Sequence, residues 1–207
     1  MEQVLDVYKR PYDEEIPVVC MDESPKQLIE TLGEEKMEQG KDKRVDYEYI
    51  REGAVNIFMA NEPLKGKRLA EVTEFKTKKD WAKFVKRIAD EMYPDAGKIT
   101  LVSDNFKTHS MGAFYEAFEP VEAKRLIDKF EFVFTPKHGS WLNMAEIELH
   151  ILTSQCLNRH IASFNEIKQE IEAWQKRRNY KNCKINWQFS TSDARIKLKR
   201  LYPSFDD

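Results

Sequence analysis

The amino-acid sequence predicts an α/β protein in which a mixed sheet is flanked by helices. Short apolar runs rich in β-branched residues and bounded by turn residues are typical of buried strands, and the clearest are Pro17–Met21 and Ile99–Ser103. Other segments repeat their apolar residues at helical spacing, as in Lys78–Met92. Strands that alternate with helices along a chain favour a sheet that is covered on both faces.

The first half of the chain is expected to supply three strands. Residues 1–16 are charged, and we interpret them as a lead-in segment before a first strand at residues 17–22. Residues 23–43 carry many charges and two glycines, which predicts a mobile excursion from the sheet. Two further strands are expected at residues 54–60 and 68–73, joined by a segment with the character of a hairpin turn.

The second half is expected to alternate helices with strands. A helix at residues 78–92 would place its large apolar side chains on one stripe. The remaining expected elements are a strand at 99–103, helices at 109–118 and 120–130, a strand at 132–135, and helices at 143–159, 164–178 and 191–201. We therefore expect one folded domain at residues 17–180 and a basic C-terminal extension at residues 181–207 that packs on it.

The composition fits a folded domain with an uneven charge distribution. The chain has 207 residues, of which 41% are hydrophobic, so it is long enough to bury a core. Its formal net charge of −2 excludes a protein that binds nucleic acid through overall basicity. Basic residues nevertheless gather late in the chain, and this pattern is compatible with a surface that faces DNA or with a solvated helix face. The members of this late cluster are Lys176, Arg177, Arg178, Lys181 and Lys184.

Cysteine usage and hydropathy favour a cytoplasmic protein. The three cysteines, Cys20, Cys156 and Cys183, form no CxxC pair, which argues against a disulfide framework or a zinc ribbon. We expect the first two to lie in the core. No apolar stretch resembles a signal peptide or is long enough to cross a bilayer, so no membrane contact is expected.

Three carboxylates lie where buried elements are expected to end or begin. Asp22 and Asp104 follow the two clearest strands, and Glu146 lies where a helical pattern begins. An acid at the end of a buried strand is unfavourable unless a partner compensates its charge. Carboxylate oxygens are the ligands that Mg²⁺ and Mn²⁺ prefer, and two such ions can clamp the attacking and leaving oxygens of a phosphodiester. The pattern therefore indicates a divalent-metal site.

Each of these acids also has a purely structural alternative. Asp22 and Asp104 are residue types that start turns, and Glu146 fits the third helical position of a capping box. Two neighbouring acids compete for the same role. Glu23 should point to the opposite face of its strand from Asp22, and Glu148 lies about 200° around a helix from Glu146, so neither is expected in the site.

Three segments in a fixed order resemble a known family. They are Val19–Glu23, then Ser103-Asp104-Asn105 followed by His109, then Pro136–Glu146. Together they resemble the catalytic domain of DDE transposases from bacterial insertion sequences, in the mariner superfamily. The resemblance extends to about Tyr202, and it implies a ribonuclease-H-like fold and metal-dependent DNA cleavage and strand transfer. It also implies a set of catalytic residues that hold Mg²⁺ or Mn²⁺, as two ions, and these are Asp22, Asp104 and Glu146.

The same resemblance implies partners and further site residues. The expected substrate is DNA, both at the ends of the element and at the target. A homodimer is also expected, and the protein should associate with the nucleoid. The family usually carries an N-terminal DNA-binding region, which we expect to be separate or missing here. Candidates for DNA contact or for support of the acids are His109, Lys137, His138, Arg177 and Arg178. His109 is equally compatible with a cap or packing role, and Trp141 is expected in the core. Another ribonuclease-H-like nuclease and an inactive DNA-binding remnant remain open as rivals.

Overall fold

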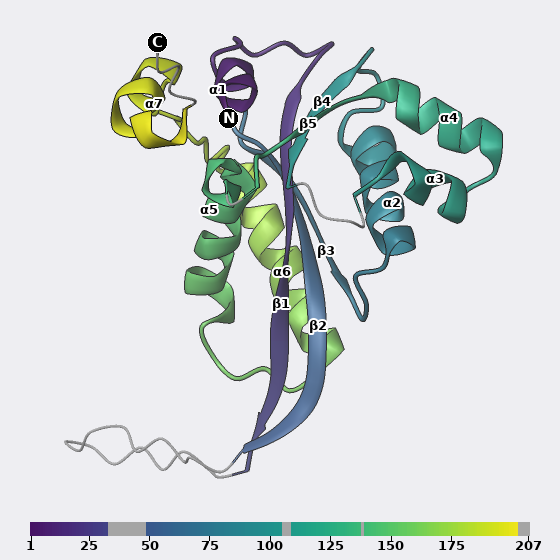
Figure 1. Ribbon diagram of the computed structural model, residues 1–207. Coiled ribbons are helices and arrows are strands. Elements are labelled where there is room, and N and C mark those ends of the chain that lie inside the picture. The colour runs from purple at the N-terminus through teal and green to yellow at the C-terminus, as the bar shows by residue number, and fades with distance from the viewer. Residues whose placement is uncertain (33–48, 105–108, 138, 203–207) are drawn as a thin grey trace.

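The computed structural model describes residues 1–32, 49–104, 109–137 and 139–202 of the chain (Figure 1). Its five-stranded sheet has the order β3-β2-β1-β4-β5. The strands are β1 (Val18–Thr31), β2 (Tyr49–Glu62), β3 (Lys67–Thr73), β4 (Ile99–Ser103) and β5 (Phe130–Phe134). Strands β1, β2 and β3 pair antiparallel, whereas β1, β4 and β5 pair parallel, so the predicted mixed sheet is confirmed.

The parallel register of the central strands brings two of the predicted acids to one level. Val18 pairs with Thr100 and Cys20 with Val102, and the same register continued by two residues sets Asp22 beside Asp104. Every residue of β4 is buried, which explains its uninterrupted apolar sequence. Strand β5 begins two residues earlier than expected, at Phe130, because the preceding helix ends there.

The prediction that the chain leaves the sheet after Asp22 is wrong for residues 23–31, because these residues continue β1. This part of β1 pairs with β2 as far as Tyr49, and the two strands extend together below the rest of the sheet (Figure 1). In this part of β1 the exposed Pro25 and Gln27 alternate with the half-buried Lys26 and the buried Leu28, and alternation of this kind permits a half-exposed strand. Pro25 is tolerated because β4 no longer pairs with β1 at that level. The rest of the expected excursion, residues 33–43, lies outside the described residues.

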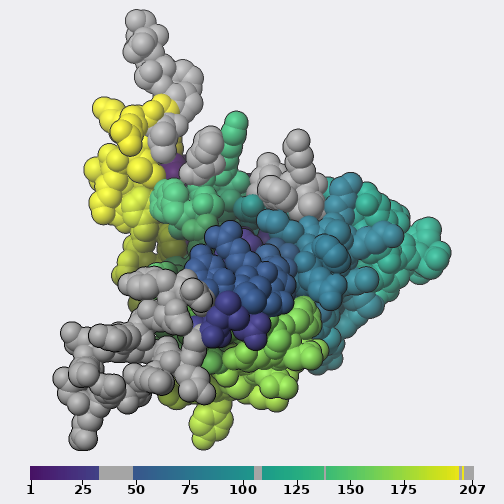
Figure 2. Space-filling model, turned by 90° about the horizontal axis from the view of Figure 1, so that it is seen from below, coloured from purple at the N-terminus to yellow at the C-terminus, as the bar shows by residue number. Residues whose placement is uncertain are grey.

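Helices cover both faces of the sheet, as the sequence predicts. One layer holds α2 (Lys78–Arg87), α3 (Met111–Ala117) and α4 (Pro120–Lys129), and the other holds α5 (Met144–Leu152) and α6 (Phe164–Tyr180). In Figure 2 the blue surface of β2 lies at the centre, with α2–α4 to its right and the lime surface of α6 below it. π-helical turns at Ile88–Met92 and Thr153–Leu157 continue α2 and α5, so the two long expected helices are each divided.

Side chains of β2 alternate between the two cores and so hold the layers together. Phe58 stacks on Phe84 of α2 at 5.3 Å between ring centroids, whereas Ile57 and Met59 pack with α5 and α6. Helix α2 begins with a capping box in which Thr77 and Asp80 bond reciprocally. The layer of α2 and α3 and the layer of α5 are therefore fixed on opposite sides of the strand that carries Asp22.

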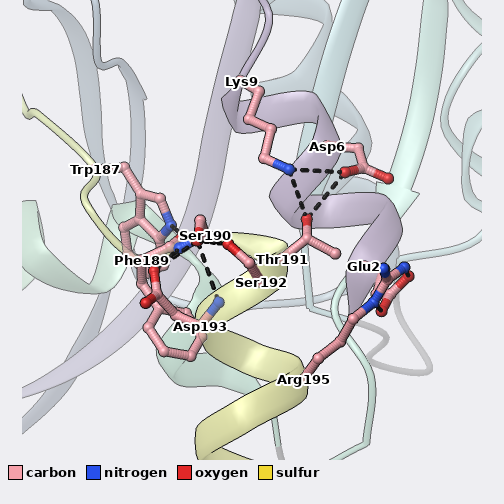
Figure 3. A network of polar contacts seen from close by, with 10 residues as sticks. All are labelled: Glu2, Asp6, Lys9, Trp187, Phe189, Ser190, Thr191, Ser192, Asp193 and Arg195. Carbon is pink, nitrogen blue, oxygen red and sulfur yellow. Dashed lines mark hydrogen bonds and ion pairs between the residues drawn. The ribbon is translucent and has the colours of Figure 1, made fainter.

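The lead-in segment contains a helix that the sequence analysis did not predict. Helix α1 (Glu2–Tyr8) buries Val4, Leu5 and Val7, and it packs against α7 (Thr191–Lys197). Figure 3 shows the polar contacts between these two helices. Thr191 donates to Asp6 at 3.0 Å and accepts from Lys9 at 3.0 Å, and Arg195 donates two hydrogen bonds to Glu2. A short 3₁₀ turn at Lys199–Leu201 follows.

Two remaining expectations concern cysteines and membranes. Cys20 is fully buried, and burial raises the pKa of its thiol to about 12. Cys156 is only half-buried, so its expected place in the core is wrong; it lies at the end of α5, where the chain turns toward α6. Among the helices of the described residues, none is long and apolar enough to span a bilayer.

Candidate active site

Asp22 lies on β1 just beyond its last pairing with β4. Its carboxylate is mostly buried, and Oδ1 accepts a hydrogen bond of 2.8 Å from the backbone N–H of Glu23. Burial raises the pKa of Asp22 to about 7; the Glu23 N–H opposes this rise, and the charges of Asp104, Glu23 and Glu146 add to it. Asp104 and Glu146 are therefore near enough to Asp22 for their charges to disfavour its ionised form.

Asn143 connects the start of α5 to Asp22. Its buried side-chain amide donates to the Met21 carbonyl at 2.7 Å and to Asp22 Oδ2 at 3.4 Å. Its Oδ1 accepts from the Ala145 N–H at 3.1 Å, which caps the helix. One side chain thus fixes both the first turn of α5 and the strand that carries Asp22.

Glu146 lies in this first turn and is half-buried. The capping-box alternative does not describe it, because the Asn143 N–H donates to the Ser140 carbonyl at 2.6 Å instead. Its charge reaches Asp22 strongly enough to contribute to the raised pKa of that residue. Glu146 therefore lies near the level at which β4 ends and β1 continues without it.

Asp104 is held by His109. Oδ1 of Asp104 lies 2.7 Å from His109 Nδ1, and Nε2 of the same ring lies 3.2 Å from Glu23 Oε2. The His109 ring stacks on Trp81 at 5.3 Å between centroids and is 4% exposed. Burial opposes protonation of this ring, but the hydrogen bonds to Asp104 and Glu23 outweigh it and raise the pKa of His109 to about 9. The residues between Asp104 and His109 lie outside the described part of the chain.

Glu23 is the residue of this region that sequence reasoning set aside. Strand alternation does turn it away from Asp22, as expected, but the face it reaches is the one that holds His109 and Trp81. Lys76 lies 3.8 Å from its other carboxylate oxygen. The signal available in the sequence was the adjacent pair Asp22-Glu23 together with a histidine five residues after Asp104, but only the tertiary fold joins them.

Glu148 has a different place from Glu146. Its side chain is fully buried and receives two hydrogen bonds of 2.6 Å from Arg68 and one of 2.7 Å from Arg178. This buried ion pair joins α5 to β3 and α6. Arg178, a candidate for DNA contact, is 14% exposed in its side chain because its guanidinium faces Glu148.

The other candidates for DNA contact lie on several surfaces. Lys137 is exposed in the loop before α5, and Arg177 lies in the last turn of α6 beside a cavity of about 440 Å³. His138 lies outside the described residues. Trp141 is 44% exposed and packs edge-on against Phe189 at 5.6 Å, so its expected place in the core is wrong. The short 3₁₀ turn at Ser140–Leu142 buries Leu142 and leaves the indole at the surface.

The donor atoms fit a hard divalent cation. Asp22, Asp104 and Glu146 offer carboxylate oxygens, which Mg²⁺ and Mn²⁺ prefer. Burial is the main cause of the raised pKa of Asp22 and the charges of the neighbouring acids add to it, so a bound cation would compensate both effects. A site of this composition is suited to binding a phosphodiester through metal ions.

Comparisons with known proteins agree with this geometry. A family model described as DDE superfamily endonuclease matches residues 17–168, more than half of the chain. The fold is similar to a crystal structure of the Mos1 mariner paired end complex with Mn, with a TM-score of 0.59, 13% identity, and coverage of 88% of this chain and 55% of that one. For a Mos1 strand transfer complex the TM-score is 0.57 and the identity 12%, with 88% of this chain and 56% of that one covered. For a Mos1 paired end complex with Mg the TM-score is 0.51 and the identity 13%, with the same two coverages.

These comparisons confirm the predicted ribonuclease-H-like fold. The chain spans little more than half the length of the structures it matches. No curated protein sequence matches the chain.

Proposed function

The chain belongs to the DDE endonuclease superfamily, and from that premise we propose that it is the catalytic domain of a DNA transposase. The observation that carries the proposal is that Asp22 on β1 lies within electrostatic reach of Asp104, after β4, and of Glu146, on α5, whose charges add to the effect of burial in raising its pKa to about 7. Acids left close to one another are typical of a site that receives a metal ion.

Each residue has a distinct role in the proposed reaction. Asp22 and Asp104 would hold Mg²⁺ or Mn²⁺ between them, and Glu146 would complete a site for two ions. Bound there, the ions would activate the attacking oxygen and neutralise charge on the phosphate. Asn143 keeps Asp22 and the first turn of α5 in one arrangement, so that positioning of the acids precedes substrate binding.

The proposed substrate is DNA, cut at element ends and joined to a target. The titles of the similar structures name paired-end and strand-transfer complexes of Mos1, and this chain shares their fold. We propose Lys137, which is exposed on the loop leading to α5, and Arg177 as contacts to the phosphate backbone. His138 is kept as a further candidate. A homodimer and a separate N-terminal DNA-binding region belong to the same proposal.

Nicking of supercoiled DNA in Mn²⁺ tests the proposed function. The parent chain should convert supercoiled plasmid to nicked circles, and Asp104→Asn should abolish the conversion because an amide cannot neutralise metal charge. Asp128→Asn is the matched control, since Asp128 is exposed on α4 and pairs only with Lys124 among the described residues.

Three outcomes would contradict the proposal. Undiminished nicking by Asp104→Asn would remove the assignment of the site. Stronger cleavage of RNA–DNA hybrids than of duplex DNA would instead indicate another ribonuclease-H-like nuclease, and DNA binding without cleavage in Mn²⁺ would indicate an inactive remnant.

A further inference from the structure

We propose that His109 and Glu23 form a positioning relay that orients the Asp104 carboxylate toward the metal. The inference rests on the proposed function, in which Asp104 is a metal ligand. Neither residue would bind the metal itself. Their part would be to hold one oxygen of Asp104, so that the other is presented to the ions shared with Asp22.

The geometry around the His109 ring supports a relay. Its two nitrogens face different acids, with Nδ1 at 2.7 Å from Asp104 and Nε2 at 3.2 Å from Glu23. One ligand atom from each of the three residues lies within 4.8 Å of the others, which also suggests a metal site. A single ion, however, can use only one nitrogen of an imidazole, whereas the two acids contact different nitrogens of this ring. The arrangement is therefore acid–imidazole–acid and not a chelate.

The two acids that contact His109 differ in their exposure to solvent. The side chain of Asp104 is 31% exposed, whereas those of Glu23 and His109 are 7% and 1% exposed. Asp104 can therefore meet a metal ion and a substrate, and Glu23 is enclosed behind it. Second partners of this kind fix the ring orientation of a histidine and the geometry of the ligand it serves.

The relay is built on rigid surroundings. Trp81, which is 1% exposed in the core of α2, stacks on the His109 ring with an interplanar angle of 19°. Nδ1 also lies 3.1 Å from the Asp104 carbonyl, so the ring contacts both the main chain and the side chain of that residue. Lys76 contacts the carboxylate oxygen of Glu23 that does not face His109. Rotation of the ring would break the contacts of both ring nitrogens and the stacking on Trp81 together.

Two substitutions of His109 separate the relay from a merely structural role. In His109→Asn, the side-chain amide nitrogen takes the place of Nδ1 and keeps the contact to Asp104. In Gln, it takes the place of Nε2 and keeps only the contact to Glu23. Binding of Mn²⁺ alone to the full chain, measured by electron paramagnetic resonance, should weaken about 10- to 100-fold in His109→Gln, the range for outer partners of metal ligands. His109→Asn should stay within about threefold of the parent.

Controls keep the inference distinguishable from the proposed function. Glu23→Gln should weaken Mn²⁺ binding less than His109→Gln does. His160→Asn should leave Mn²⁺ binding unchanged, because His160 contacts Thr31 at the last residue of β1, away from the site. Equal loss in His109→Asn and His109→Gln, or no loss in either, would overturn the relay while Asp104→Asn still abolished binding. If Asp104→Asn bound Mn²⁺ as the parent does, the proposed function itself would fail.

Discussion

At the scale of single residues, the site contains one acid, Asp22, whose ionised form is unfavourable without a cation. The pKa of Asp22 is raised from 3.8 to about 7, so the native protein binds a proton that the unfolded chain has already released between these pH values. Stability contributed by this group is highest below pH 4 and falls as the pH rises to about 7. A tenfold difference in proton affinity between the folded and unfolded states corresponds to about 1.4 kcal/mol, so the loss is on the order of a few kcal/mol.

This sign gives a prediction for Asp22→Asn without metal. In EDTA at pH 8 the variant should unfold at a higher temperature than the parent, because the amide removes the buried charge and its repulsion. At pH 4 the gain should largely disappear, since Asp22 is then protonated in the native parent. Thermal unfolding followed by circular dichroism measures both values, and a variant that is less stable at pH 8 would contradict this view of the site.

At the scale of elements, α5 is fixed at its start and at its middle by two different contacts. Asn143 bonds the first turn to β1, and Glu148 pairs with Arg68 of β3 and Arg178 of α6. The angular argument that Glu146 and Glu148 face apart was available from the sequence. That Glu148 lies in a buried ion pair was not, because its partners are distant in sequence and Arg178 looked like part of a solvated basic face.

The buried ion pair predicts a large cost for Glu148→Gln. Removal of one partner leaves two buried guanidinium groups without a compensating charge, which destabilises by about 3–5 kcal/mol. Urea unfolding should show this loss, and Glu172→Gln, on the exposed face of α6, should change the free energy of unfolding by less than about 0.5 kcal/mol. Similar values for the two variants would mean that the Arg68–Glu148 contact contributes nothing to stability.

The start of α5 predicts a separation of stability from activity. In Asn143→Ser the hydroxyl can still cap the helix, but the Met21 carbonyl loses its buried hydrogen bond, so the free energy of unfolding should fall by about 1–3 kcal/mol. The shorter side chain cannot reach the Met21 carbonyl, so Asp22 and Glu146 lose their fixed relation, and DNA nicking should fall by up to about 100-fold. Nicking at the parental rate would show that this contact does not position the acids.

At the scale of the whole molecule, much of the architecture followed from local sequence. The apolar run at Ile99–Ser103 and the helical stripe beginning at Lys78 were sufficient for β4 and α2, because their signals are local and strong. Helix α1 escaped prediction because seven residues give too short a pattern, and it is stabilised by packing against α7. The extension of β1 depends on pairing with β2, and the Glu23–His109–Asp104 contacts depend on the folded sheet.

DNA binding is also a property of the whole surface. Arg177→Ala should weaken binding to unrelated duplexes equally and reduce the slope of log affinity against log salt by up to about one unit. Arg178→Ala should instead lower stability, because its guanidinium pairs with Glu148. Fluorescence anisotropy across salt concentrations separates the two, and an Arg177→Ala chain that binds as the parent does would make Arg177 an ordinary solvated residue.

The central claim is that Asp104 binds the metal ion that supports DNA cleavage, and a change of ligand atom tests it most directly. Asp104→Cys replaces a hard oxygen by a sulfur, which Mg²⁺ accepts poorly and Mn²⁺ tolerates better. Relative to the parent in each metal, plasmid nicking by this variant should be lost in Mg²⁺ and partly restored in Mn²⁺. Equal activity relative to the parent in both metals would contradict metal binding by Asp104.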